Sequence, residues 1–339
     1  MITIRKRTEN YETENLSEYA AKSSETKGRK KPCDKCDVRT DFQRDRDRIT
    51  HSKAFRRLMH KTQVFIFPDS DHCRTRLTHT IEVSQISRAI SRALRLNDDL
   101  TEAIALGHDL GHTPFGHIGE NVLAKLNPYG FEHNSQSVRI LEYLENGGKG
   151  LNLTAEVLDG IFNHRSKLEP KTLEGKVVQL SDKIAYVNHD IDDAVRAGLI
   201  KMPDLPKSCI DILGDTASDR INTLINSIIE NSMDKNYVTM DTIVSDALKG
   251  LRKFMFENVY LDGEHLKNSF KVEHTLKGLY DYYMGSPQNM PAEYISMWES
   301  GKELPVVVCD YVAGMTDRYV LKIYSDMFMP ADKVWQRGF

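Results

Sequence analysis

Three histidines and two carboxylates stand close together in residues 104–120, whose sequence is IALGHDLGHTPFGHIGE. Leu100 and Ile104 precede His108 at intervals of four, which predicts that His108 projects from the inward face of a short helix. Asp109 follows directly. Neutral imidazole and carboxylate groups are ligands that bind divalent metals, and a buried helix end holds such ligands still. The pair therefore indicates one edge of a metal site.

The residues after this pair are rich in glycine and proline. Gly111 and Pro114 are expected to end the helix, because proline removes a backbone donor and glycine favours the turn. We expect the tight loop that follows to present His112, His117 and Glu120 beside the metal site.

Two further ligand candidates lie on other predicted helices. In the helix predicted for residues 76–96, His79 lies four positions before Val83, the first residue of an apolar stripe. In the helix predicted for residues 175–197, Asp182 begins a row that continues at intervals of four. A single histidine at such a place is more often a core residue than a ligand. The prediction of a metal site therefore depends on the candidate ligands occurring together.

The row that begins at Asp182 continues with Tyr186 and Asp190, roughly opposite the apolar stripe of the same helix. A solvated face usually carries lysine and glutamate, so Asp-Tyr-Asp favours the lining of a pocket. The alternative is an exposed acidic face, since Asp192 and Asp193 also lie here. Two imidazoles and two carboxylates on three helices suit Mn, Fe, Co, Ni, Mg or Zn, with positions left for water and substrate.

The elements that must position these residues are predicted to be helices throughout. Besides the helices already named, amphipathic patterns cover residues 47–63, 134–145, 155–165, 219–233, 242–260, 265–284 and 306–328. The exception is a short β-hairpin arm, which is predicted near residues 63–68 and is built from residues 64–68. No βαβ alternation, internal repeat, Walker A sequence or dinucleotide-binding glycine fingerprint occurs, which leaves an all-α fold.

Composition limits the class of protein. The chain has 339 residues, a net charge of −3 and five scattered cysteines. The charge gives no global basic field for nucleic acid, and the cysteines do not suggest a disulfide framework. No apolar stretch reaches the length of a transmembrane helix and the start lacks a signal-peptide pattern, so we expect a cytoplasmic protein without membrane contact.

Three parts are expected along the chain: a polar N-terminal arm at residues 1–40, a catalytic core at 41–200, and a helical C-terminal region at 201–339 that packs on the core. The arm contains Cys33 and Cys36. One Cys-x-x-Cys without a second pair is weak evidence for zinc, and two reduced thiols on a loop are the favoured interpretation.

These motifs resemble a known family. The order His, His-Asp, Asp is similar to that of the HD-domain metal phosphohydrolases and, more narrowly, to the dGTPase (deoxynucleoside triphosphate triphosphohydrolase) family. The resemblance covers residues 40–195 densely and the region near 310–320 again. It is carried by DRDRI at 45–49, SKAFRRL at 52–58, KTQV at 61–64, RTRLTH at 74–79, HDLGHTPFGH at 108–117 and DYVAGMTD at 310–317.

The resemblance implies an HD-type helical fold that hydrolyses a deoxynucleoside triphosphate to deoxynucleoside and inorganic triphosphate. It implies metal ligands at His79, His108, Asp109 and Asp182, and catalytic residues at His117, Glu120 and His133, together with His112, which matches a histidine that some members replace. It further implies that Gln63 contacts the sugar 3′-hydroxyl, that Tyr186 and Asp190 pack against the deoxyribose, and that Arg76 and Lys183 contact phosphates.

The chemistry of the reaction supports this set. A metal with Arg or Lys neutralises the phosphates and makes water a better nucleophile, while the leaving 5′-oxygen needs a proton. His117 and Glu120 are three residues apart and share a face on a helical turn, so His117 is expected to be the acid/base that Glu120 orients.

Alternatives keep part of this interpretation. The same metal site could serve another nucleotide phosphohydrolase, namely a monophosphatase, a cyclic-nucleotide phosphodiesterase or an alarmone hydrolase. The chain could also be a regulatory or single-stranded nucleic-acid-binding protein with a vestigial site, whose basic segments at 27–31 and 44–57 track phosphates. Related enzymes form symmetric oligomers, often hexamers, and some bind an activating nucleotide. The sequence selects neither the metal nor the base.

Overall fold

The computed structural model describes residues 2–63, 74–260 and 263–329, without the side chains of residues 260 and 263–268. Within these ranges the regular structure is helical, and the only extended pairings are two isolated bridges, Arg29 with Thr154 and Thr62 with Thr75. The all-α prediction is confirmed. The β-hairpin predicted near 63–68 lies, from residue 64 on, outside the described residues.

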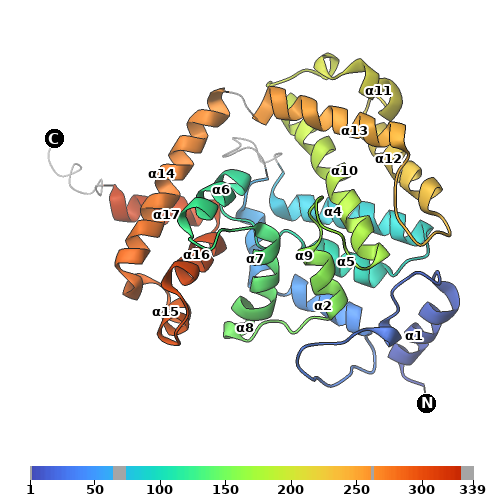
Figure 1. Cartoon of the computed structure of the whole chain (residues 1–339), viewed down its shortest axis with the longest axis horizontal. Coiled ribbons are helices and arrows are strands. Elements are labelled where there is room, and N and C mark those ends of the chain that lie inside the picture. Colours follow the sequence, from blue (N-terminus) through green and yellow to red (C-terminus); the bar gives the residue numbers. More distant parts are fainter. Residues whose placement is uncertain (1, 64–73, 261–262, 330–339) are drawn as a thin grey trace, which may run out of the picture.

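The helices follow one another along the chain, with the longest connection between α1, which ends at Asn15, and α2, which begins at Asp41 (Figure 1). In the first half they are α1 Ile4–Asn15, α2 Asp41–Thr50, α3 Lys53–Arg57, α4 Arg76–Ala93, α5 Asp98–Gly107, α6 Gly116–Leu126, α7 His133–Arg139, α8 Glu145–Gly148 and α9 Ala155–Phe162. In the second half they are α10 Leu173–Arg196, α11 Lys207–Leu213, α12 Ala217–Ser232, α13 Thr242–Met255, α14 Gly263–Gly285, α15 Ala292–Glu299, α16 Leu304–Gly314 and α17 Asp317–Phe328. A π-helical turn follows α7 at Ile140–Leu144 and another follows α13 at Phe256–Tyr260.

Two helices predicted as continuous are broken, each at a hydroxyl residue that caps a new helix. The helix predicted for 47–63 divides because the Ser52 side chain accepts a hydrogen bond from the Phe55 amide and starts α3. The helix predicted for 306–328 divides because Thr316 accepts from the Tyr319 amide and starts α17. A hydroxyl that satisfies a free backbone donor favours a helix start over continuation.

The loop predicted to present His117 and Glu120 is also wrong in part. The turn ends at Phe115 and Gly116, which both have positive φ (61° and 57°), and α6 then carries His117 and Glu120 in its first turns. Their spacing of three residues therefore places them on one helical face, as expected from the spacing alone.

A first hydrophobic core holds the middle of the molecule together. It is formed by α2, α4, α5 and α9–α13, with Leu100, Ile104 and Ile184 among its fully buried side chains. Helix α4 packs against both α5 and α10, so the three helices that carry the predicted metal ligands are direct neighbours. No helix among the described residues is long and apolar enough to cross a membrane.

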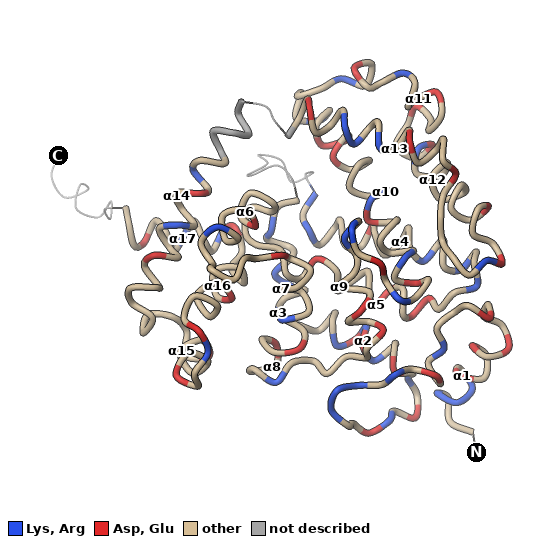
Figure 2. The backbone as a smooth tube through the Cα atoms, viewed as in Figure 1, with Lys and Arg blue, Asp and Glu red and all other residues tan. Residues whose placement is uncertain are grey.

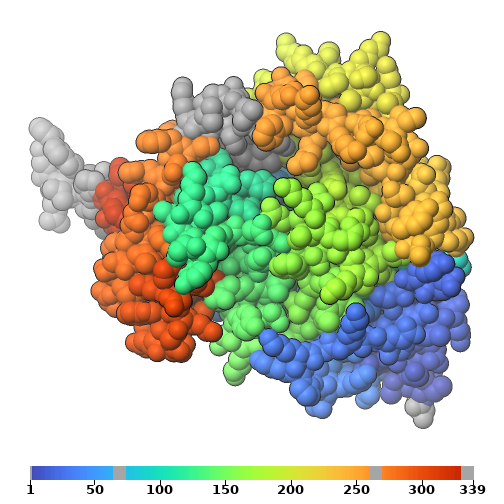
Figure 3. Space-filling model, viewed as in Figure 1, coloured from blue at the N-terminus to red at the C-terminus, as the bar shows by residue number. Residues whose placement is uncertain are grey.

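A second hydrophobic core lies at the other side of the molecule. It joins α6, through Val122 and Leu123, to α14–α17, which contribute Leu279 and Val312 among others. The surface of α6 adjoins that of these C-terminal helices in Figure 3. Helices α11–α13 belong to the first core and α14–α17 to the second. Helices from before and after residue 200 therefore pack together in both cores. The division of the chain at residues 40 and 200 stays a prediction.

Residues 2–40 are polar, yet they contain a helix and are tied to the core by buried charges. Arg5 of α1 donates to Asp41 at 3.1 Å, and Arg29 pairs with Asp45, which is fully buried. Glu156 accepts from the Lys27 amide at 2.7 Å. These contacts explain how a segment without an apolar stripe packs on the core. Cys33 and Cys36 are both free thiols.

Candidate metal and catalytic site

The four predicted metal ligands meet between α4, α5 and α10. The His79 Nε2 atom lies 3.2 Å from an Asp182 carboxylate oxygen, and the His108 Nε2 atom lies 3.8 Å from the same oxygen. An Asp109 oxygen is 3.3 Å from His108 Nε2, and its other oxygen is 3.9 Å from His79 Nε2. His79, His108 and Asp109 are buried, whereas the Asp182 side chain is 22% exposed. The cluster therefore has one side open to a substrate.

Hydrogen bonding fixes which nitrogen of His108 carries its proton. The Nδ1 atom lies 2.7 Å from the Ala105 carbonyl oxygen, which can only accept, so Nδ1 must be the donor. The Nε2 atom then has a lone pair, and it is buried without a hydrogen-bond partner. An unpartnered lone pair facing two carboxylates fits a divalent cation, since ligating histidines usually donate their other nitrogen to a carbonyl.

Both carboxylates of the cluster are held in the charged form. Burial would raise the pKa of Asp182, but the hydrogen bond with His79 and the electrostatic influence of the neighbouring His108 ring outweigh it and lower the pKa to about 2. Burial opposes ionisation of Asp109 as well, yet His108, His112 and Arg76 lower its pKa well below the usual value. Ionised carboxylates are the form that binds metal.

A second group of side chains is built around Glu120 of α6. The His117 Nδ1 atom lies 3.1 Å from one Glu120 oxygen, and the His133 Nδ1 atom lies 2.9 Å from the other. The His133 amide also donates to Glu120 at 3.0 Å. Burial would raise the pKa of Glu120, but the hydrogen bonds to His117 and His133 lower it strongly. Glu120 is therefore an anion that orients two imidazoles, of which His117 has a side chain 73% exposed.

His112 connects this group to the metal cluster. Its Nε2 atom lies 3.0 Å from an Asp109 oxygen, and its ring stacks on that of His133 with centroids 4.0 Å apart. Burial and the nearby Arg76 lower the pKa of His112 well below its usual value, so the ring is neutral near pH 7. The two groups form one continuous site.

The residues expected to contact substrate lie next to the ligands or on the same helix as Asp182. Arg76 is buried and donates to Asp109 at 2.8 Å. The second terminal nitrogen of its guanidinium donates to the Gln63 carbonyl oxygen at 3.4 Å. Lys183, Tyr186 and Asp190 continue along α10 beyond Asp182. Asp190 is only 3% exposed, which rules out a solvated acidic face at that position.

Two residues of the site were missed by sequence reasoning. Arg252 of α13 places its guanidinium 5.9 Å from the Tyr186 ring centroid. The sequence around it is that of an ordinary amphipathic helix and does not indicate a site residue. His164 is buried, and its Nε2 atom lies 3.1 Å from His133 Nε2. The apolar positions Val157 and Ile161 lead to His164 at helical spacing, which is the signal that identified His79.

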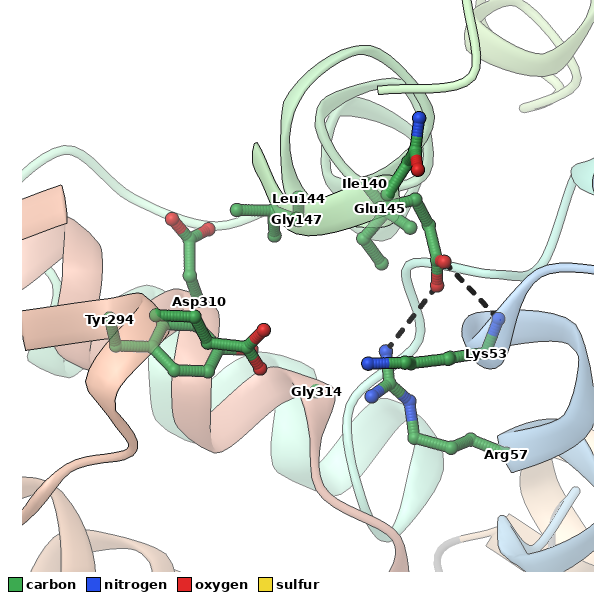
Figure 4. A pocket seen from close by; sticks show the side chains of 11 residues that line it. Lys53, Arg57, Ile140, Leu144, Glu145, Gly147, Tyr294, Asp310 and Gly314 are labelled. Carbon is green, nitrogen blue, oxygen red and sulfur yellow. Dashed lines mark hydrogen bonds and ion pairs between the residues drawn. The ribbon is translucent and has the colours of Figure 1, made fainter. Parts of the chain in front are cut away.

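The pocket drawn in Figure 4 is separate from this site. It lies between α3, the turn at Ile140–Leu144 with α8, and the helices α15 and α16, and it is lined by Arg57, Tyr294 and Asp310 but by none of the four candidate ligands. Glu145 crosses its edge, where it accepts from the Lys53 amide at 3.2 Å and lies 3.9 Å from Arg57. The chemistry-bearing residues therefore lie outside this pocket.

Two protein families match the chain. The HD domain matches residues 76–187, and the phosphohydrolase-associated domain matches residues 238–326. Among solved structures, a phosphohydrolase from Bacteroides thetaiotaomicron aligns with a TM-score of 0.52 at 17% sequence identity, covering 85% of this chain and 70% of that one. This likeness concerns the fold alone. HD domains bind divalent metals, in agreement with the histidine–aspartate cluster.

Curated relatives match over nearly the whole chain. A deoxyguanosinetriphosphate triphosphohydrolase-like protein from Caldanaerobacter subterraneus subsp. tengcongensis is 56% identical over 331 residues, which cover 97% of each chain. A protein of the same name from Clostridium tetani is 47% identical over 340 residues, again covering 97% of each chain. The chain belongs to the deoxyguanosinetriphosphate triphosphohydrolase-like family of HD-domain phosphohydrolases.

Proposed function

We propose that the protein hydrolyses deoxynucleoside triphosphates, dGTP or several of them, to deoxynucleoside and inorganic triphosphate in a metal-dependent reaction. The observation that carries this proposal is the continuous site: a buried cluster suited to a divalent cation, joined through His112 to an exposed histidine that a buried glutamate orients. The names of the relatives support the substrate class.

His79, His108, Asp109 and Asp182 would hold the ion, which can be Mn²⁺, Mg²⁺, Fe²⁺, Co²⁺, Ni²⁺ or Zn²⁺, since all of them accept nitrogen and oxygen ligands. A divalent ion at this place supplies Lewis acidity toward phosphate oxygens and toward water. The hydrogen bond from His108 Nδ1 to Ala105 fixes the ring so that Nε2 faces the two carboxylates and would be free to bind an ion.

His117 is the proposed general acid. The bond cleaved lies between the α-phosphorus and the 5′-oxygen, and the departing oxygen needs a proton. Glu120 binds the Nδ1 side of the ring, which leaves the Nε2 atom of this largely exposed histidine available to the substrate. His133 contacts the other oxygen of Glu120 and would hold it in place. His112 contacts Asp109 and so would link this group to the metal cluster.

The triphosphate and the sugar need separate contacts. Arg76, Lys183 and the newly found Arg252 supply positive charge around the open side of the cluster, as a triphosphate requires. Tyr186 and Asp190 would pack against the deoxyribose and exclude a 2′-hydroxyl, and Gln63 would contact the 3′-hydroxyl.

The other expected partners are proposals as well. A homo-oligomer, plausibly a hexamer, and an activating nucleotide follow from the family alone, and a cytoplasmic location fits a soluble enzyme family. Weak binding to single-stranded nucleic acid is the least supported, because many basic side chains are paired within the chain. Arg46 lies 3.1 Å from Asp99, and Arg48 donates to the Asn152 carbonyl. Figure 2 shows both signs of charge interspersed along the described elements.

Product analysis tests the proposal. The purified protein is incubated with each of the four dNTPs and with GTP, singly and mixed, with Mn²⁺ or Mg²⁺, and the products are separated by ion-exchange chromatography. Deoxynucleoside with intact triphosphate, and little product from GTP, is the expected result. Orthophosphate or pyrophosphate as the first product would instead favour another nucleotide phosphohydrolase, and silence under every condition would favour a regulatory binding protein.

A further inference from the structure

The two hydrophobic cores meet at the candidate site, and the polar contacts between them include Arg139 with Asp310 and Thr62 with Asp317. The metal-ligand helices α4, α5 and α10 belong to the first core, whereas α6, which carries His117 and Glu120, belongs to the second. Catalysis by this arrangement needs a fixed distance between the two groups, because misplacement by about 1 Å can reduce a rate on the order of 100-fold. Contacts that set this distance therefore matter for the rate of the proposed reaction.

Asp317 makes such contacts from the far end of the chain. It is the first residue of α17 and is 3% exposed. One carboxylate oxygen accepts from the Thr62 amide at 3.0 Å and from the Thr62 hydroxyl at 2.8 Å. The other oxygen accepts from the Phe115 amide at 3.0 Å. The donors lie 255 and 202 positions away in the sequence.

The two donors belong to segments that carry site residues. Thr62 directly precedes Gln63, and Phe115 precedes Gly116 and His117. Phe115 and Gly116 both have positive φ, a conformation that is uncommon for a bulky residue such as phenylalanine. The hydrogen bond from the Phe115 amide to a buried carboxylate stabilises this turn, and the turn sets the direction in which α6 begins.

The two segments also approach each other closely. A Cβ atom at Gly116 would lie 3.1 Å from both the Arg76 guanidinium and the Gln63 carbonyl oxygen. Lys61 adds a parallel contact, since its buried Nζ atom donates to the carbonyl oxygens of His112 and, at 2.9 Å, of Ala313 in α16. The junction of α16 and α17 thus binds the Gln63 segment and the His117 turn at once.

We propose that Asp317 is a positioning residue for the reaction: by bonding Thr62 and Phe115 together, its carboxylate fixes the general acid of α6 relative to the sugar-contacting Gln63 and to Arg76. The inference rests on the proposed function of this site. It gives the DYVAGMTD motif at 310–317 a role, because the motif supplies Asp317 from the phosphohydrolase-associated region. Asp317 does not touch the reacting atoms and acts through the two segments.

The first test replaces Asp317 with asparagine. The Asp317→Asn variant lacks the charge and offers one acceptor to three donors, so the Phe115 turn or the Thr62 segment loses its contact. We expect kcat for a dNTP to fall by about 10- to 100-fold with bound metal unchanged, as measured by elemental analysis. Asp219→Asn is the matched control, because Asp219 accepts from the amide and hydroxyl of Thr216 in the same way but in α12, away from the site.

A second pair of variants covers the case in which Asp317→Asn fails to fold. Thr62→Val keeps the shape of the side chain and removes the hydroxyl, whereas Thr62→Ser keeps the hydroxyl. We expect Thr62→Val to lower kcat and Thr62→Ser to retain it, when both are assayed at a temperature at which each variant is fully folded. A purely structural role would change stability without separating the two variants in kcat.

Amide hydrogen exchange separates failure of this inference from failure of the proposed function. The Thr62 and Phe115 amides should lose protection in Asp317→Asn and keep it in Asp219→Asn, whether or not the protein hydrolyses a dNTP. The variant could lose protection at these amides while the unaltered protein hydrolyses no dNTP. That result would reject the proposed function and, with it, a role of Asp317 in that reaction. Unchanged protection, or a kcat within about twofold of the unaltered enzyme, overturns the inference.

Discussion

The two halves of the candidate site are built in different ways. The candidate metal ligands lie on α4 and α10 and at the C-terminal end of α5, three neighbouring helices of one hydrophobic core, and their positions follow from the packing of those helices. His117 and Glu120 lie on α6, which packs with α14–α17 in a second core. The geometry of the first half is local to one core, whereas the placement of the second half depends on contacts between cores.

This difference predicts a part for the C-terminal region in the proposed reaction. Helix α6 lies inside residues 76–187, which match the HD domain, yet it packs on helices of residues 238–326, which match the phosphohydrolase-associated domain. Changes in the first core are therefore expected to act through metal binding. Changes in the second core are expected to act through turnover with the metal still bound.

The largest effect is expected in the first core. Asp109→Asn removes an ionised ligand and also loses the pairing with Arg76 and His112, so we expect bound metal and hydrolysis to fall to background. Elemental analysis and a dNTP assay measure both. His60→Ala, at an exposed histidine, is the control. Metal retained at the unaltered stoichiometry would contradict the assignment of Asp109.

The next effect breaks the second half alone. His117→Ala should leave metal content unchanged, because this exposed residue lies outside the ligand cluster, and should lower kcat by about 100- to 10,000-fold, the usual contribution of a general acid. Near-full turnover with metal bound would show that another group protonates the leaving oxygen.

A smaller effect is expected from loosening the contact between the cores. Lys61→Met fills a similar volume but leaves the carbonyl oxygens of His112 and Ala313 without their donor. We expect a loss of about 1–3 kcal/mol in the free energy of unfolding and a moderate decrease in kcat. Denaturant unfolding measures the first, with the exposed Lys302→Met as control. Unchanged stability would mean that water replaces the ammonium group at both carbonyls.

The smallest effect concerns the first core only and depends on pH. Burial raises the pKa of Glu174 to about 7 from its ordinary 4.5, although the Asn97 and Ala21 amides donate to it. The folded state therefore binds a proton more tightly between pH 4.5 and 7, and stability falls as the pH rises through this range. Glu174→Gln should melt higher than the unaltered protein at pH 8 and lose this advantage at pH 5. An equal difference at both pH values would contradict the raised pKa.

Helical periodicity was sufficient for the first half of the site. His79 and His108 each lie in register with an apolar stripe, and Asp182 begins a polar row roughly opposite one, so their convergence could be predicted once the helices were taken to pack together. The family resemblance added the order of the motifs. The roles given to all of these residues stay predictions until variants are measured.

The second half could not be placed in the same way. The glycine and proline content of residues 111–116 indicated a loop, whereas the positive φ of Phe115 allows α6 to begin immediately after it. Arg252 and Asp317 reach the site from helices distant in sequence, and no local pattern reports a contact over 255 positions. Asp317 was visible only as part of a motif without an assigned role.

The most direct test of the two-part site is hydrolysis of a dNTP in water labelled with ¹⁸O. If water attacks the α-phosphorus beside the metal cluster while His117 protonates the 5′-oxygen, the label enters the inorganic triphosphate and none enters the deoxynucleoside. Mass spectrometry of both products measures this. Label in the deoxynucleoside, or in a released orthophosphate, would contradict the proposed division of labour between the two halves.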